Sequence, residues 1–155
     1  MLFYIDQVKQ LAKRVSEIVK HGDVITLDGE LGAGKSTFSK FLIEALGFDY
    51  IGSPTFSKII TYESPKHCLW HCDLYQMGDQ SNQKHTVINS KQNTFNQLNE
   101  YIYDSESGIL IVEWACKYPN LKLLEDIIEI KIEHYSENQR KISITKHGRF
   151  NYITI

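Results

Sequence analysis

Residues 29–36 read Gly-Glu-Leu-Gly-Ala-Gly-Lys-Ser and match the pattern G-x-x-x-x-G-K-[ST] at every fixed position. Glycines let the backbone curl until successive N–H groups converge on phosphate oxygens, and a helix starting after them adds its own unpaired N–H groups. The sequence therefore predicts a nucleotide-phosphate site, with an accidental glycine-rich turn as the alternative. Its predicted residues are Gly32, Ala33, Gly34, Lys35, Ser36 and Thr37.

Two acidic residues that end predicted strands could complete this site. Glu113 follows the apolar run 109–112, and in P-loop proteins a carboxylate there holds Mg²⁺ together with the loop hydroxyl, here Ser36. Asp73 follows the strand candidate at residues 67–72 and could orient an attacking water or the shell of the metal. The alternatives are a solvated strand end for Glu113 and a turn or cap for Asp73.

A third polar residue, Thr55, lies in segment 53–56, where P-loop proteins place a mobile stretch that senses the γ-phosphate. An ordinary turn fixed by Pro54 is the equal alternative. The pairs 67–68 and 71–72, each His-Cys, suggest zinc. Neighbours on a strand point to opposite faces, however, and no second ligand pair has suitable spacing, so metal ligation by these pairs is disfavoured.

The elements that must position these residues follow from the spacing of apolar side chains. Helical spacing predicts helices over 5–19 and 35–46, and β-branched or alternating runs predict strands over 23–28, 56–62, 68–74 and 108–113. Alternation at 128–133, with turns at 136–139 and 147–149, predicts an antiparallel meander. The predicted fold is α/β, a P-loop NTPase-like three-layer sandwich with a central mixed sheet and an antiparallel C-terminal part. The Gln/Asn-rich stretch 76–99 is predicted to be a polar excursion, closed by a short helix around Leu98.

Composition narrows the class of protein. The 155 residues favour one domain over 1–155, and 17 basic against 19 acidic residues disfavour a stand-alone reader of DNA or RNA. No apolar run approaches the roughly 18–20 residues that span a bilayer, and no secretory signal is evident. The three cysteines suggest no disulfide framework, so we expect a cytoplasmic protein.

The chain lacks the Asn-Lys-x-Asp motif of GTPases, which makes ATP the expected nucleotide. A small-molecule kinase usually brings several arginines to the transferred phosphoryl group. Here Arg14 lies on the first predicted helix, and Arg140 and Arg149 flank a strand of the meander, so no arginine finger is evident near the loop. We expect binding of ATP and Mg²⁺ with slow hydrolysis that a partner accelerates. A nucleoside or small-molecule kinase and a nucleotide-dependent binding module are the alternatives.

Taken in order, residues 29–37, 53–56, 71–75 and 112–114 resemble the motifs of the TsaE (YjeE) family, over roughly residues 5–118. The resemblance implies a P-loop ATPase that supports synthesis of N6-threonylcarbamoyladenosine in tRNA, next to the anticodon. It also implies two partners, the threonylcarbamoyl transferase TsaD and its inactive paralogue TsaB, which ATP binding and hydrolysis reset between turnovers. Contact with tRNA would be indirect, with no role for DNA or a membrane.

Carried onto the matching positions, the resemblance assigns phosphate binding to Lys35, Mg²⁺ to Ser36 and Glu113, hydrolysis to Asp73, and a switch-like loop to Thr55. Trp114 would pack beside the site.

The chain also departs from the family pattern. Gln76 stands where relatives usually have Arg, Val8 where they commonly have Thr near the adenine, and Ala115 where Pro often follows. These differences bear on the adenine contacts, partner docking and hydrolysis rate, and leave the phosphate site intact.

Overall fold

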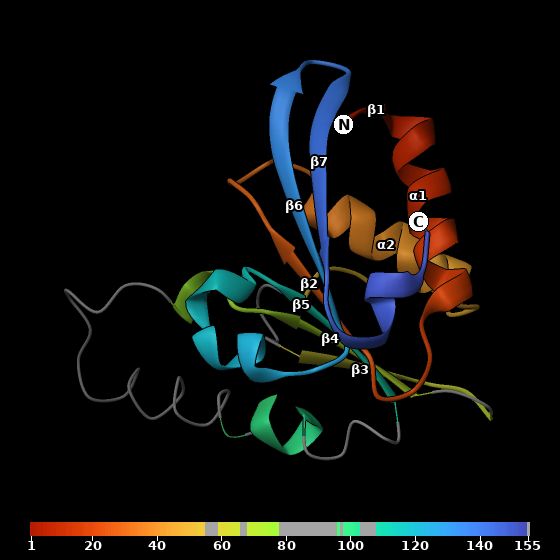
Figure 1. Cartoon of the computed structure of the whole chain (residues 1–155), viewed down its shortest axis with the longest axis vertical. Coiled ribbons are helices and arrows are strands. Elements are labelled where there is room, and N and C mark those ends of the chain that lie inside the picture. Colours follow the sequence, from red (N-terminus) through yellow and green to blue (C-terminus); the bar gives the residue numbers. More distant parts are fainter. Residues whose placement is uncertain (55–58, 66–67, 78–95, 97, 103–107, 155) are drawn as a thin grey trace.

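A seven-stranded sheet in the order β1-β7-β6-β2-β5-β4-β3 organises the chain (Figure 1). The computed structural model describes residues 1–54, 59–65, 68–77, 96, 98–102 and 108–154. β2, β4, β5 and β6 run parallel, whereas β1, β3 and β7 are antiparallel to their neighbours, so the predicted mixed sheet is confirmed. The strands are β1 (Leu2–Tyr4), β2 (Val24–Asp28), β3 (Ile59–Glu63), β4 (Cys68–Asp73), β5 (Gly108–Glu113), β6 (Ile127–Ser136) and β7 (Gln139–Lys146).

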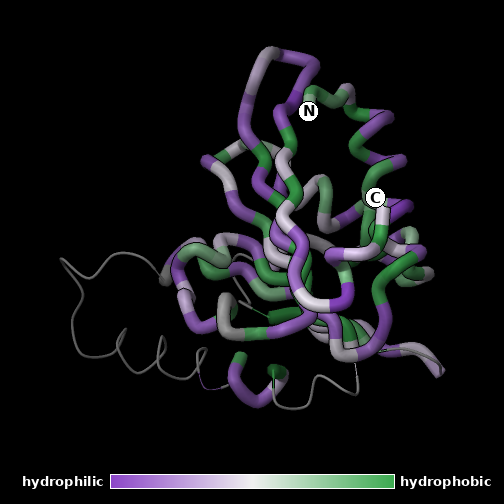
Figure 2. Tube along the Cα trace, in the orientation of Figure 1, coloured by the Kyte–Doolittle hydropathy of each residue, from purple (hydrophilic) through white to green (hydrophobic). Residues whose placement is uncertain are grey.

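Two helices, α1 (Ile5–Ile18) and α2 (Lys35–Ala45), cover one face of the sheet. The buried residues of α1, at positions 8, 11, 12 and 15, recur at helical spacing and form one apolar stripe. Figure 2 shows hydrophobic and hydrophilic residues alternating along α1 and along the β6–β7 hairpin. Among the described helices, none is long and apolar enough to cross a membrane.

The opposite face is covered by residues 98–102 and by two 3₁₀ helices, η3 (Ala115–Lys117) and η4 (Pro119–Leu123). Two further 3₁₀ helices, η1 (Tyr75–Met77) and η5 (Gly148–Tyr152), follow β4 and β7. Leu98 and Leu121 pack on this face with Trp70, which stacks on Tyr101 at 4.9 Å between ring centres. The sheet therefore separates two apolar layers, as the predicted three-layer sandwich requires.

Most predicted elements lie within a residue or two of the observed ones. The helices end at 18 and 45 rather than at 19 and 46, and the predicted antiparallel meander is the β6–β7 hairpin. β1 was not predicted, because three residues carry too little periodicity to be recognised. Of the predicted polar excursion, residues 78–95 and 97 lie outside the described part of the chain, and 98–102 are helical.

The parallel strands bring the predicted site residues Asp73 and Glu113 to one edge of the sheet. β2, β4 and β5 run in the same direction, so Asp28, Asp73 and Glu113 all stand at their carboxyl ends, along one edge of the sheet. Open α/β sheets bind ligands at this edge.

Candidate nucleotide site

The loop 29–34 joins β2 to α2, and two of its glycines are required for different structural reasons. Gly34, the residue before α2, has φ 110°, a left-handed conformation that a side chain would disfavour. At Gly29 a Cβ atom would collide with the main-chain oxygen of Ile132 in β6. The first glycine is thus needed for close approach to the sheet, and the last for the curl that starts α2.

Lys35 is buried under the loop that it follows, with 4% of its surface exposed. Its Nζ donates to the carbonyl oxygens of Gly29 at 2.7 Å and Glu30 at 2.9 Å, and lies 3.7 Å from the centre of the Trp114 ring. Burial lowers the pKa of Lys35, although the carboxylates of Glu113 and Asp73 oppose this shift. The predicted packing of Trp114 beside the site is therefore seen as a cation–π contact.

Glu113 is almost fully buried, at 1% exposure, and both of its carboxylate oxygens have partners. Ser36 Oγ donates to Oε2 at 2.8 Å, and Ser39 Oγ and His71 Nε2 each lie 2.8 Å from Oε1. Burial raises the pKa of Glu113, but the interactions with His71, followed by those with Ser39 and Ser36, outweigh burial and hold the pKa below its usual value. The network therefore keeps an ionised carboxylate beside the loop.

Asp73 is the register partner of Glu113 on the neighbouring strand and is 5% exposed. Its Oδ1 accepts a hydrogen bond from the backbone N–H of Tyr75 at 2.7 Å, so Asp73 does shape the turn after β4. It also lines a cavity of about 260 Å³ together with Lys35, Ser36 and Glu113. The turn role and a role in the site are thus geometrically compatible.

The residues around this cavity form a set of hard oxygen donors. A carboxylate of Glu113, a hydroxyl of Ser36 and the nearby carboxylate of Asp73 suit Mg²⁺, which prefers oxygen ligands completed by substrate phosphates. The described residues contain no group of three or more His, Cys, Asp or Glu side chains that could hold a metal alone. The donor set therefore fits a cation that is shared with a phosphate.

The structure bears on the zinc hypothesis for the two His-Cys pairs, but not on the γ-phosphate sensor predicted at Thr55. His71 and Cys72 lie on different sides of the sheet, since His71 contacts Glu113 whereas Cys72 packs in the opposite layer. This divergence is the one that disfavoured zinc. His67 and Thr55 lie outside the described residues, so the role predicted for Thr55 stays a prediction.

One arginine lies beside the loop, a placement that the sequence did not indicate. Arg140, at the start of β7, donates through Nε to the carbonyl oxygen of Ala33 at 2.9 Å. β6 and β7 form a long hairpin that carries Arg140 to the loop, and the two residues joined by this bond lie 107 positions apart in the chain. Local spacing carries no signal for such a contact.

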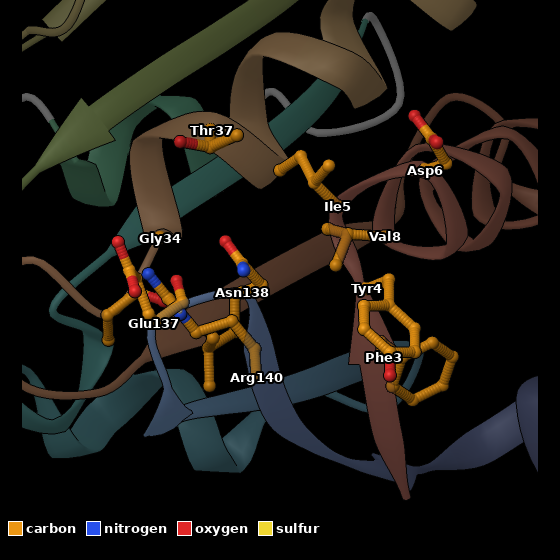
Figure 3. Close-up of a pocket in the computed structure, with 12 residues that line it drawn as sticks. Phe3, Tyr4, Ile5, Asp6, Val8, Gly34, Thr37, Glu137, Asn138 and Arg140 are labelled. Atoms are coloured by element: carbon orange, nitrogen blue, oxygen red, sulfur yellow. Dashed lines mark hydrogen bonds between the residues drawn. The ribbon is translucent and has the colours of Figure 1, made fainter.

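A larger cavity, of about 520 Å³, adjoins the loop on the side of Arg140 (Figure 3). Its walls come from β1 and the start of α1 on one side and from the β6–β7 turn on the other, and Gly34 and Thr37 form the junction with the phosphate loop. Val8 is one of the lining residues. The cavity continues the phosphate site toward the N-terminal helix.

Sequence reasoning assigned no role in the site to Ser39, His71 or Arg140. Signals for the first two existed: Ser39 lies three residues after Ser36 and so shares its face of α2, and His71 lies two residues before Asp73 and so shares its face of β4.

The fold and the loop together define an α/β protein of the P-loop type. A family model described as "Threonylcarbamoyl adenosine biosynthesis protein TsaE" matches residues 4–142. The chain belongs to the TsaE family.

Individual relatives agree with this assignment. A protein of Bacillus subtilis strain 168, named "tRNA threonylcarbamoyladenosine biosynthesis protein TsaE", is 35% identical over 92% of this chain and 82% of its own length. A protein of the same name from Aquifex aeolicus strain VF5 is 36% identical, over 87% of this chain and 86% of its own. The crystal structure of Bacillus subtilis YdiB superposes with a TM-score of 0.68 at 29% identity, covering 96% of this chain and 86% of that one.

Proposed function

We propose that this protein binds ATP with Mg²⁺, hydrolyses it slowly, and thereby supports the formation of N6-threonylcarbamoyladenosine in tRNA. The proposed partners are the threonylcarbamoyl transferase TsaD and its paralogue TsaB, with tRNA contacted indirectly. The single observation that carries the proposal is the 2.8 Å contact between Ser36 Oγ and Glu113 Oε2, at the start of a helix that opens with Lys35.

The phosphates would bind at the N-terminus of α2, where unpaired N–H groups favour an anion. Lys35 would exchange its two carbonyl partners, Gly29 and Glu30, for phosphate oxygens, which are stronger acceptors because they are charged. The ring of Trp114 would guide the ammonium group during this exchange, since it lies within 3.7 Å of Nζ.

The metal would be held by Ser36 Oγ and Glu113 Oε2, which now bond to each other. Glu113 Oε1 would keep its bonds to Ser39 and His71, so the carboxylate would remain oriented while Oε2 changes partner. Bound Mg²⁺ would neutralise charge on the β- and γ-phosphate oxygens. Asp73 would orient the attacking water from the adjacent strand end.

The cavity of about 520 Å³ supports a nucleotide rather than inorganic phosphate as the ligand. Its lining combines the apolar side chains of Phe3, Ile5 and Val8 with a few polar groups, the composition expected for a site that buries a planar base.

The positions of the arginines support slow ATP hydrolysis by the protein without its partners. Arg149 pairs with buried Asp23, Arg14 is exposed on α1, and the hydrogen bonds of Arg140 end on backbone carbonyls. Of the arginines in the described residues, Arg149 and Arg140 are thus engaged by groups of this chain, and Arg14 lies on the exposed side of α1. A partner that supplies positive charge at the third phosphate would accelerate hydrolysis, as arginine fingers do.

The proposal is tested by mixing the protein with TsaD and TsaB, with and without ATP, and by measuring co-purification and ATP hydrolysis. We expect ATP-dependent association and faster hydrolysis in the mixture. Lys35→Ala should weaken ATP binding by roughly 10–150-fold, because charge-assisted contacts contribute about 1.5–3 kcal/mol. Lys40→Ala, on the exposed side of α2, is the matched control. Equal ATP affinity in the two variants, or phosphorylation of a metabolite without any protein partner, would refute the proposal.

A further inference from the structure

One guanidinium group, that of Arg140, bridges two separate stretches of backbone. Nε donates to Ala33 in the phosphate loop at 2.9 Å, and Nη1 donates to Ser136 and Gln139 in the β6–β7 turn, each at 3.0 Å. Guanidinium is planar and its donors have a fixed fork geometry. Its bonds therefore hold the loop and the turn in one mutual arrangement.

The bond to Ala33 also orients a peptide group of the loop. In a trans peptide the C=O of Ala33 and the N–H of Gly34 point in opposite directions, and the described residues contain no cis peptide. Fixing the carbonyl on Arg140 thus directs the N–H of Gly34 away from Arg140. This peptide turns about ψ of Ala33 and φ of Gly34, and glycine resists such rotation only weakly, so the bond from Arg140 adds a constraint that Gly34 does not supply.

Arg140 also brings charge to this place. Among the described residues, every hydrogen bond that Arg140 donates ends on a backbone carbonyl oxygen. The ion pairs that arginines form within this part of the chain are those of Arg149. The guanidinium group therefore lies where the cavity of about 520 Å³ meets the loop, and Figure 3 shows Arg140 and Gly34 at this junction.

We propose that Arg140 is a positioning residue that fixes the Ala33–Gly34 peptide and joins the phosphate loop to the wall of the neighbouring cavity, so that the triphosphate and base of one nucleotide are held in a single geometry. This inference rests on the proposed nucleotide site. It adds a residue that acts on the phosphates through the loop, although it lies on the side of the cavity.

The test compares wild type, Arg140→Lys, Arg140→Ala and the control Lys141→Ala by calorimetric titration with MgATP and with magnesium tripolyphosphate. Lys141 is the next residue along β7, and its side chain is 55% exposed, so its removal deletes the same charge without touching the loop. We expect Arg140→Lys and Arg140→Ala to lose about tenfold or more in affinity for both ligands, because neither can make the forked contact. Lys141→Ala should bind like wild type.

Chemical rescue separates positioning from a general loss of structure. Millimolar guanidinium should restore tripolyphosphate binding to Arg140→Ala, whereas equal ammonium should not, since only guanidinium reproduces the fork. Wild-type affinity in Arg140→Lys would assign the effect to charge alone and overturn the inference. So would a loss confined to ATP, which would restrict Arg140 to the base, or absence of guanidinium rescue. If wild type binds neither ligand, the proposed function fails as well, which is a different result from unchanged affinity in the variants.

Discussion

Asp23 and Glu113 are both carboxylates with 1% of their surface exposed, and they stand at opposite edges of the same sheet, before β2 and at the end of β5. Asp23 is paired with a permanent cation, since Nε of Arg149 lies 3.1 Å from Oδ1 and Nη2 contacts Oδ2. Among the described partners of Glu113 there is no lysine or arginine, only two serine hydroxyls and an imidazole.

The two environments shift the pKa values of Asp23 and Glu113 in opposite directions. Burial raises the pKa of Asp23, and the contacts with Arg149 and Lys20 offset it only in part. The pKa of Glu113 is lowered because its hydrogen bonds outweigh burial. A buried charge is therefore no mark of a site by itself. In the proposed function, what distinguishes Glu113 is that one donor, Ser36, would be exchanged for a cation while Ser39 and His71 still support the carboxylate.

The largest expected effect is on stability at the structural carboxylate. Arg149→Ala leaves Asp23 buried without its cation, and breaking a buried pair in this way costs about 3 kcal/mol or more. Urea unfolding should show the loss, while the folded variant keeps its ATP affinity. Arg14→Ala, at an exposed position on α1, serves as control and should unfold like wild type. Loss of ATP affinity in folded Arg149→Ala would contradict the distinction between Asp23 as a structural carboxylate and Glu113 as a carboxylate of the nucleotide site.

The second effect concerns the metal. Glu113→Gln keeps acceptors for Ser39 and His71 but removes the charge, so we expect the affinity for MgATP to fall about tenfold or more while binding of ATP in EDTA stays near wild type. Titrations with and without Mg²⁺ measure both quantities. Equal losses of affinity under the two conditions would contradict the assignment of Mg²⁺ binding to Glu113.

A smaller effect is expected at His71, which acts through Glu113. Removing the partner of a metal ligand typically lowers metal affinity by about 10–100-fold, and His71→Leu should fall at the low end because Ser39 still holds Oε1. His71→Gln retains an N–H donor and should recover part of the loss. The readout is the Mg²⁺ dependence of ATP binding, with binding in EDTA as the internal control. If Leu and Gln behave alike, the hydrogen bond from His71 has no role in metal affinity.

The smallest effect is the pH dependence of unfolding. Glu113 has a folded pKa below its usual 4.5, so its contribution is complete above pH 4.5 and is lost as pH falls through the lowered value. Asp23 has a folded pKa above its usual 3.8, so protonation favours the folded state and that contribution is lost as pH rises through the raised value. Subtracting the unfolding free energies of Glu113→Gln and Asp23→Asn from wild type should therefore give slopes of opposite sign. Slopes of equal sign would contradict the assignment of the two shifts.

Sequence alone predicted the elements whose signals are local. The loop 29–36, both helices and the strands ending at Asp73 and Glu113 have periodic or motif-like patterns, and parallel pairing then brings their ends together. The support around Glu113 was less accessible, because the spacing of Ser39 and His71 indicates a shared face but not a shared partner. The role of Arg140 could not be predicted from the sequence, because its contact with Ala33 depends on the geometry of the β6–β7 hairpin.

The pairing of β1 with β7, with Leu2 opposite Lys141, means that the larger cavity is built from the two extremes of the chain. On the ribosome, residues 24–36 emerge early, but the strand that packs against Gly29 and the second wall of the cavity are absent until Ile132 and Arg140 have been synthesised. The phosphate loop and the cavity beside it are therefore completed together, late in synthesis of the chain.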